Sequence, residues 1–99
     1  MRIIWSAEAL REIQLIVDYI SADNPTSALA LAERILGVVE TTLSDNPNLG
    51  RPGRVSGTRE LAVHTSYLVA YQISTDSVDI LTVRHAARLW PESFSDHDD

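Results

Sequence analysis

Residues 58–85, TRELAVHTSYLVAYQISTDSVDILTVRH, decide the fold. This stretch holds three runs in which apolar and polar residues alternate with a period near two, over residues 58–64, 67–74 and 78–85. Alternation of that kind indicates β-strands, and links of only two or three residues force neighbouring strands to run antiparallel. The sequence therefore predicts a three-stranded antiparallel meander.

Two helices are predicted before the meander. Ser6 is a good N-cap for a helix ending near residue 22, and Asn24 and Pro25 are typical of the cap and first position of a second helix that runs to about residue 44. Apolar residues recur at steps of three and four along the first helix, at Leu10, Ile13, Val17 and Ile20. The link between the helices is short, so we expect an antiparallel helical hairpin.

Residues 2–5, RIIW, are short and mainly apolar and include two β-branched isoleucines, which favours a first strand. The predicted fold class is α+β, with the order β-α-α-β-β-β and the helical hairpin packed on a mainly antiparallel four-stranded sheet. Residues 1–91 are expected to form a single domain. Residues 92–99 carry four acids and no base, and we expect them to be an acidic mobile tail.

Composition narrows the class of protein. The chain has no cysteine, which excludes disulfides and thiolate metal sites and fits a reducing compartment. We see neither a signal peptide nor an apolar stretch long enough to span a bilayer. The expectation is a cytoplasmic protein without membrane attachment.

The sequence lacks the residues that several kinds of functional site require. The three histidines are scattered, so we expect no metal site, and no nucleotide-binding or nucleophile-elbow motif is present, so we expect no cofactor. The acids of the first helix, Glu8, Glu12 and Asp18, are interpreted as its solvated face.

Positive charge is concentrated in one part of an acidic chain. The net charge is −6, yet residues 51–90 carry five arginines against three acids, a balance of +2. All eight basic residues are arginines, and an arginine fork binds carboxylates and phosphates in a way that lysine cannot.

Five arginines are predicted to meet on one concave surface near the strand ends and to bind the target or a partner: Arg51, Arg54, Arg59, Arg84 and Arg88. Such a cluster repels itself unless an anion compensates it. The alternative is structural, in which Arg59 pairs with Glu60 or Asp79 while Arg51 and Arg54 keep a loop solvated. Arg84 is expected to have few local acids to neutralise it. His85 is the neighbouring group able to act as a base near neutral pH, although a lone histidine at a strand end is more often structural.

The element order, together with the segments NPNLGRPGRVSGTREL, YLVAY and VDILTVRHAARLWP, resembles the ParE/RelE superfamily of toxins from bacterial type II toxin–antitoxin modules. The likeness covers roughly residues 2–91. It implies a toxin made alongside an antitoxin whose flexible C-terminal part wraps the toxin. ParE-like members act on DNA gyrase, and RelE-like members cut mRNA on the ribosome.

The hairpin joined at DNP and the GTREL strand look more ParE-like, so the resemblance implies a plasmid-stabilisation type of growth inhibitor that acts on gyrase. The alternatives are a ribosome-dependent endoribonuclease, with His85, Arg84 and Arg59 as its catalytic candidates, and a non-toxic binding module on the same fold. The chain departs from the RelE-like pattern because it has no lysine and no tyrosine after Tyr71. Net acidity argues against strong direct binding to nucleic acid. Leu31 and Leu36 are candidates for an exposed groove that receives the antitoxin. The alternative is that they pack a homodimer or the helical hairpin itself.

Overall fold

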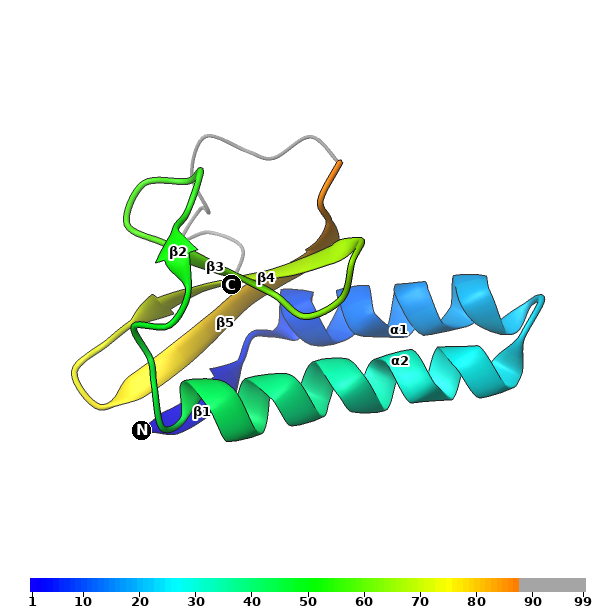
Figure 1. The fold of residues 1–99 in the computed structure, drawn as a ribbon, viewed down its shortest axis with the longest axis horizontal. Helices are drawn as coiled ribbons and strands as arrows, with labels where there is room; N and C mark the ends of the chain where they lie inside the picture. Colours follow the sequence, from blue (N-terminus) through cyan, green and yellow to red (C-terminus); the bar gives the residue numbers. More distant parts are fainter. Residues whose placement is uncertain (88–99) are drawn as a thin grey trace.

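The computed structural model describes residues 1–87, so Arg88 and the predicted tail of residues 92–99 lie outside the described residues. Two antiparallel helices cover one face of a twisted sheet (Figure 1). The elements are β1 (Arg2–Trp5), α1 (Ala7–Ser21), α2 (Pro25–Val38), the π-helical turn η1 (Val39–Leu43), β2 (Arg51–Pro52), β3 (Arg59–Ala62), β4 (Tyr67–Ile73) and β5 (Ser77–His85). The α+β class and the predicted meander are confirmed.

The sheet has five strands in the order β1-β5-β4-β3-β2, one more than the four predicted. The added strand, β2, is only two residues long and pairs Arg51 with Glu60 and Pro52 with Arg59. Its proline suits an edge strand, where a missing N–H breaks no ladder. β1 pairs with β5 in parallel, and every other pairing is antiparallel.

The helix starts follow the predicted capping residues. The Ser6 side chain accepts from the Ala9 amide, and the Asn24 side chain accepts from the Ser27 amide with Pro25 in the first turn. The regular part of the second helix ends earlier than predicted, at Val38, and continues as the π-helical turn η1.

The core lies between the hairpin and one face of the sheet. Its buried residues include Ile13, Leu31, Ile35, Val69, Tyr71, Ile80 and Val83. Leu10 belongs to the apolar stripe of α1, but it is 49% exposed, because the buried residues of α1 are Ala9, Glu12 and Ile13. Leu31 is 8% exposed and belongs to this core, so the expected antitoxin groove at Leu31 is wrong.

β5 does not alternate strictly along its length. Ala70 pairs with Thr82 but the next residue, Tyr71, pairs with Ile80, so Leu81 is an extra residue in β5. The extra residue reverses the face of the residues that follow, which is why Ile80 and Val83 both enter the core.

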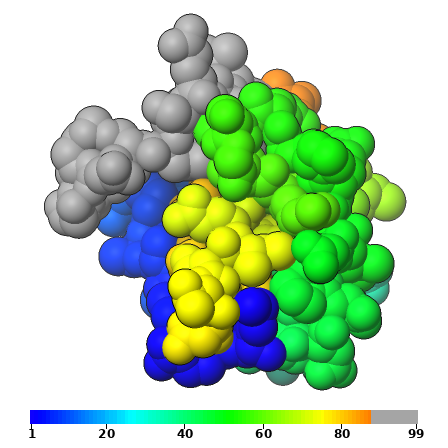
Figure 2. All heavy atoms as spheres, turned by 90° about the vertical axis from the view of Figure 1, so that its left-hand side faces the viewer, coloured from blue at the N-terminus to red at the C-terminus, as the bar shows by residue number. Residues whose placement is uncertain are grey.

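The N-terminus is held at one end of the molecule. The Met1 amine donates to the Ser44 carbonyl at 2.9 Å, and the Trp5 indole donates to Glu40 at 2.9 Å. Figure 2 shows this end, with the dark blue N-terminal residues between the yellow β4–β5 turn and the green segment that follows α2. These contacts hold β1 against η1 and Ser44.

Candidate functional site

Residues 50–57, GRPGRVSG, which we call the Gly/Arg segment, lie before β3 and are built around a buried carboxylate. The Glu60 side chain is only 2% exposed, and it pairs with Arg51 at 3.2 Å and with Arg54 Nε at 3.1 Å. The Arg54 backbone amide also donates to Glu60 at 2.8 Å, and an Arg54 Nη1 donates to the Ala86 carbonyl at 3.3 Å. Arg54 therefore joins the loop both to β3 and to the end of β5.

Burial alone would raise the pKa of Glu60. The hydrogen bonds from the Arg54 backbone and from the Arg54 and Arg51 side chains outweigh that effect, and the pKa lies below its ordinary value of 4.5. Glu60 therefore stays charged between the two guanidinium groups.

Arg59 lies on the other side of the sheet. In the sheet register Arg59 lies opposite Tyr71, and Tyr71 lies opposite Ile80. Because Tyr71 and Ile80 belong to the core, this row is on the face that packs on the helices. Its Nη1 donates to the carbonyls of Gly50 at 2.7 Å and Asn48 at 3.2 Å. Arg59 thus ties down the segment before β2, and neither Glu60 nor Asp79 is its hydrogen-bond partner in these contacts.

Tyr71 also holds the segment before β2. Its hydroxyl donates to the Pro47 carbonyl at 2.7 Å and accepts from the Gly50 amide at 2.8 Å. Burial raises the pKa of Tyr71 above 10.0, and the Gly50 amide and the Arg59 charge oppose that rise only in part. A Cβ on Gly50 would lie 2.6 Å from the Tyr71 hydroxyl, so this position requires glycine.

Arg84 is paired with an acid of α1, contrary to the expectation of few local acids. Its Nε lies 3.4 Å from Glu12 Oε2. Glu12 Oε1 also accepts from the Thr82 hydroxyl at 2.5 Å and from the Val83 amide at 3.0 Å. Glu12 is 8% exposed and was interpreted wrongly as part of a solvated face, since it closes the edge of β5 just beyond the end of β1.

His85 lies at the exposed end of β5. Its ring makes an edge contact with Tyr67, with centroids 5.5 Å apart, and its Nδ1 accepts from the Ala87 amide at 3.1 Å. Nε2 therefore carries the proton of the neutral ring.

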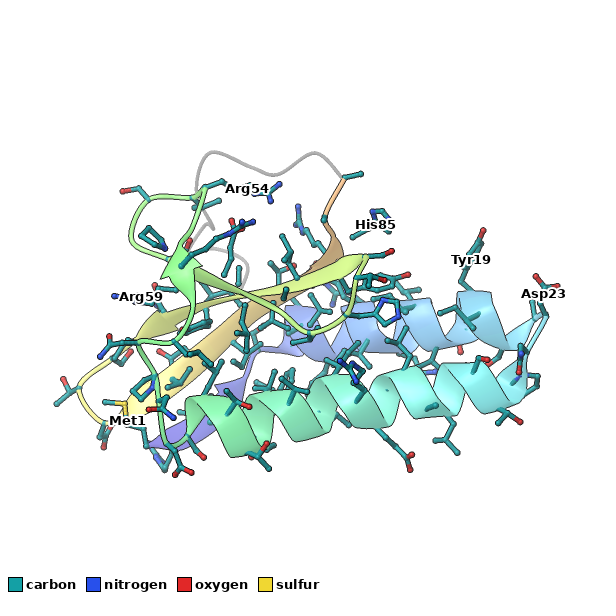
Figure 3. All side chains as sticks on the ribbon, viewed as in Figure 1. Met1, Tyr19, Asp23, Arg54, Arg59 and His85 are labelled. Carbon is teal, nitrogen blue, oxygen red and sulfur yellow. The ribbon has the colours of Figure 1, made fainter. Side chains whose placement is uncertain are left out.

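The structure brings some of the predicted arginines together. Arg51 and Glu60 share a cross-strand row with Ala70 and Thr82, on the sheet face opposite the helices, which we call the outer face. Arg54 contacts Glu60 on that face, and Arg84 belongs to the next row on it. Arg59 is on the opposite face, and Figure 3 shows Arg54 and Arg59 well apart.

Sequence reasoning missed a groove between α1 and the end of β5. It has a volume of about 390 Å³ and is lined by Glu12, Leu15, Ile16, Tyr19, Tyr67, Val83, Arg84 and His85. Leu15 is 61% exposed and Tyr19 is 82% exposed. Leu15 follows Glu12 by three residues and Tyr19 follows Leu15 by four, so all three lie on one side of α1. The spacing of these residues along α1 was the available signal.

No helix within residues 1–87 has the combination of length and apolar character needed to cross a membrane. The model of the family described as "ParE toxin of type II toxin-antitoxin system, parDE" matches residues 3–90. The chain belongs to this family of toxins, within the ParE/RelE superfamily.

Curated relatives agree with that membership. The chain is 44% identical over 92 residues to the protein Y4kP of Sinorhizobium fredii, covering 92% of this chain and 94% of Y4kP. It is 33% identical over 88 residues to toxin RelE2 of Caulobacter vibrioides, covering 89% of this chain and 98% of RelE2.

Solved structures share the fold. A protein of the chromosomal ParDE system from P. aeruginosa has a TM-score of 0.72 and 22% identity, over 86% of this chain and 95% of that one. The YoeB/ParE toxin from Agrobacterium tumefaciens has a TM-score of 0.60 and 12% identity, over 86% and 98%. Family membership implies an antitoxin as the partner of this chain.

Proposed function

We propose that this toxin stops bacterial growth by binding DNA gyrase in the cytoplasm, without chemistry of its own, and that its cognate antitoxin neutralises it. Support comes from the match of a ParE family model to residues 3–90 and from the positions and contacts of the candidate catalytic residues.

The observation that carries the proposal is the separation of those candidates. Arg59 lies on the helix-packed face and donates to backbone carbonyls, whereas Arg84 is paired with Glu12 on the outer face. General acid–base catalysis needs groups within hydrogen-bond reach of one reacting centre. Arg59 cannot share such a centre with Arg84 and His85 without leaving the segment that it holds.

A protein whose charged groups are already paired with one another is better suited to binding a protein surface than to acid–base catalysis. Arg51 is 67% exposed at its side chain while bonded to Glu60, so its position is fixed before any partner arrives. A fixed cation loses less side-chain entropy on binding than a mobile one. Exposed Arg51 and the outer face around it are the surface that we propose meets gyrase.

The test is a supercoiling assay with purified gyrase and the purified toxin, run beside a ribosome-dependent mRNA cleavage assay. We expect loss of supercoiling at micromolar toxin, recovery when the antitoxin is added, and intact mRNA. Undisturbed gyrase would reject the proposal.

The relative named RelE2 is the observation that favours the alternative, a ribosome-dependent endoribonuclease. Toeprinting on translated mRNA would then reveal cuts, and His85→Ala would abolish them. Cuts that persist in that variant would remove His85 from the mechanism.

A further inference from the structure

The outer face of the sheet has an apolar middle. Leu68 and Ala70 of β4 lie on it, because they pair with Arg84 and Thr82 of β5 in the outer-face rows. Leu68 is 7% exposed and Ala70 is 0% exposed, although α1 and α2 pack on the other face (Figure 1). Neither helix can cover these two residues, so their cover lies on the outer face itself.

The Gly/Arg segment lies at one side of this face, and the end of β5 is tied to it. Arg54 contacts Glu60 on the outer face, and Figure 3 shows Arg54 on the side of the sheet away from the helices. Arg54 Nη1 also donates to the carbonyl of Ala86, the residue after β5, at 3.3 Å. The chain therefore leaves β5 beside the outer face.

Residues 88–99, which we call the C-terminal segment, follow this point. An extended chain spans about 3.3 Å per residue, so the segment can reach about 40 Å. The strands β5, β4, β3 and β2 are successive neighbours in the sheet, and neighbouring strands lie about 4.8 Å apart, so the distance across them is about 14 Å. The C-terminal segment is long enough to cross the whole outer face.

The composition of the C-terminal segment matches that face. Its sequence, RLWPESFSDHDD, carries one arginine against four acids and also holds large apolar residues, among them Trp90 and Phe94. Arg51 shares the Glu60 carboxylate with Arg54, yet its side chain is still 67% exposed. An exposed guanidinium has five N–H donors and can bind a further carboxylate.

We propose that the C-terminal segment folds back over the outer face, with its apolar side chains against Leu68 and Ala70 and its acids near Arg51. This docked segment replaces the mobile tail expected for residues 92–99. The family model ends at residue 90, so the four acids lie outside the part of the chain that it matches. Docking places the segment on the surface proposed to meet gyrase and thereby weakens target binding. That consequence rests on the proposed function, whereas the docking itself does not.

The first test locates the segment by paramagnetic broadening in NMR spectra. The chain has no cysteine, so Ser95→Cys gives a single attachment point for a nitroxide in the full chain. We expect strong broadening of the Arg51 and Ala70 amide signals and little at Asn24, which lies in the hairpin turn at the far end of the helices (Figure 1). Equal broadening in the two regions, or none in either, would overturn the proposal.

The second test asks whether the acids hold the segment. In the labelled chain, one variant changes the four acids of residues 92–99 to amides, and a matched control changes four exposed acids elsewhere, namely Asp18, Asp23, Glu33 and Asp45. Both lose four negative charges. We expect the first variant to shift the equilibrium about tenfold towards the undocked state and to lose most of the broadening at Ala70, while the control keeps it. Equal broadening in both would contradict docking through charge.

A mixing experiment distinguishes docking within one chain from docking between two. Nitroxide-labelled protein is mixed with ¹⁵N-labelled protein that carries no nitroxide, and the Arg51 and Ala70 signals should stay sharp. Broadening in this mixture would assign the outer face to the segment of a second copy, and the proposal would fail.

The supercoiling assay then measures the consequence for the target. The variant without acids in residues 92–99 should reach half-inhibition of gyrase at about three- to tenfold lower concentration than the matched control. Equal inhibition would contradict an effect of docking on target binding. If no form of the protein disturbs gyrase, the proposed target fails, while the broadening experiments still decide whether the segment docks.

Discussion

Within residues 1–87, the two buried carboxylates Glu60 and Glu12 hold arginines, and the regions around them differ. Glu60 is surrounded by the chain's own donors, since it binds Arg51, both the backbone and the side chain of Arg54, and thereby the whole Gly/Arg segment. Glu12 accepts from the Val83 amide at the edge of β5, and an apolar groove lies beside it.

The difference shows that arginine density is a poor guide to which surface is available for a partner. In the segment richest in arginine, many of the hydrogen-bond donors are used within the fold itself. The α1 stretch around Glu12, which has an ordinary helical pattern, leaves the apolar side chains of Leu15 and Tyr19 exposed. Because both acids are buried, the two cases differ in what surrounds the acid: donors of the Gly/Arg segment at Glu60, and an apolar groove beside Glu12.

The largest expected effect comes from removing the charge at the first carboxylate. Glu60→Gln should lower the free energy of unfolding by about 2–3 kcal/mol, since it leaves two guanidinium groups without their anion and disturbs the Arg54 backbone contact. Urea unfolding at neutral pH measures this loss.

The exposed Glu33→Gln on α2 is the control for loss of one negative charge, with an expected change below about 0.5 kcal/mol. An acid titration sharpens the result. Because the folded-state pKa of Glu60 is below 4.5, its contribution is complete above that pH and is lost as the pH falls through the folded pKa. Glu60→Gln should lack this part of the acid slope, and an identical slope in both proteins would contradict the pairing.

Tyr71 holds the residues that lie just before β2. Tyr71→Phe should cost about 1–2 kcal/mol, because the Gly50 amide and the Pro47 carbonyl lose their buried partner. The folded-state pKa of Tyr71 is raised, so above about pH 10 the unfolded chain loses this proton first and stability falls as the pH rises.

Urea unfolding between pH 8 and 11 should therefore show a smaller alkaline loss in Tyr71→Phe than in the wild type. Tyr19→Phe is the matched control, because it removes a phenol hydroxyl from a side chain that is 82% exposed. A wild-type slope in Tyr71→Phe would assign the alkaline loss to another group.

Sequence reasoning succeeded where contacts are local. The caps at Ser6 and Asn24, the helical hairpin and the three long strands all depend on residues close in the chain, and all are confirmed. The two-residue strand β2 and the extra residue Leu81 were missed because neither leaves a periodic pattern.

The site was harder to predict for a related reason. Glu12 and Thr82 are 70 positions apart, so their contact leaves no trace in local spacing, and a buried acid on a helix looks like an exposed one. The five predicted arginines divide accordingly: three contact acids on the outer face, Arg59 lies on the helix-packed face, and Arg88 is outside the described residues.

A smaller loss is expected at the second carboxylate. Glu12→Gln keeps an acceptor oxygen for the Val83 amide but loses the charge facing Arg84, so the cost should be about 1 kcal/mol, below that of Glu60→Gln. Paired urea unfolding curves measure the difference. A larger loss for Glu12 than for Glu60 would reverse the comparison between the two regions.

The smallest expected effects come from substituting two glycines, one within α2 and one in the loop before β3. Gly37 lies within α2, and a Cβ there meets nothing within 4 Å, so Gly37→Ala should stabilise the protein by about 0.5 kcal/mol through the reduced entropy of the unfolded chain. Gly57 has equally open space but a φ of +81°, so Gly57→Ala should cost about 1 kcal/mol. Thermal melts of the two variants should shift in opposite directions. Shifts of the same sign would mean that backbone conformation does not distinguish the loop from the helix at these positions.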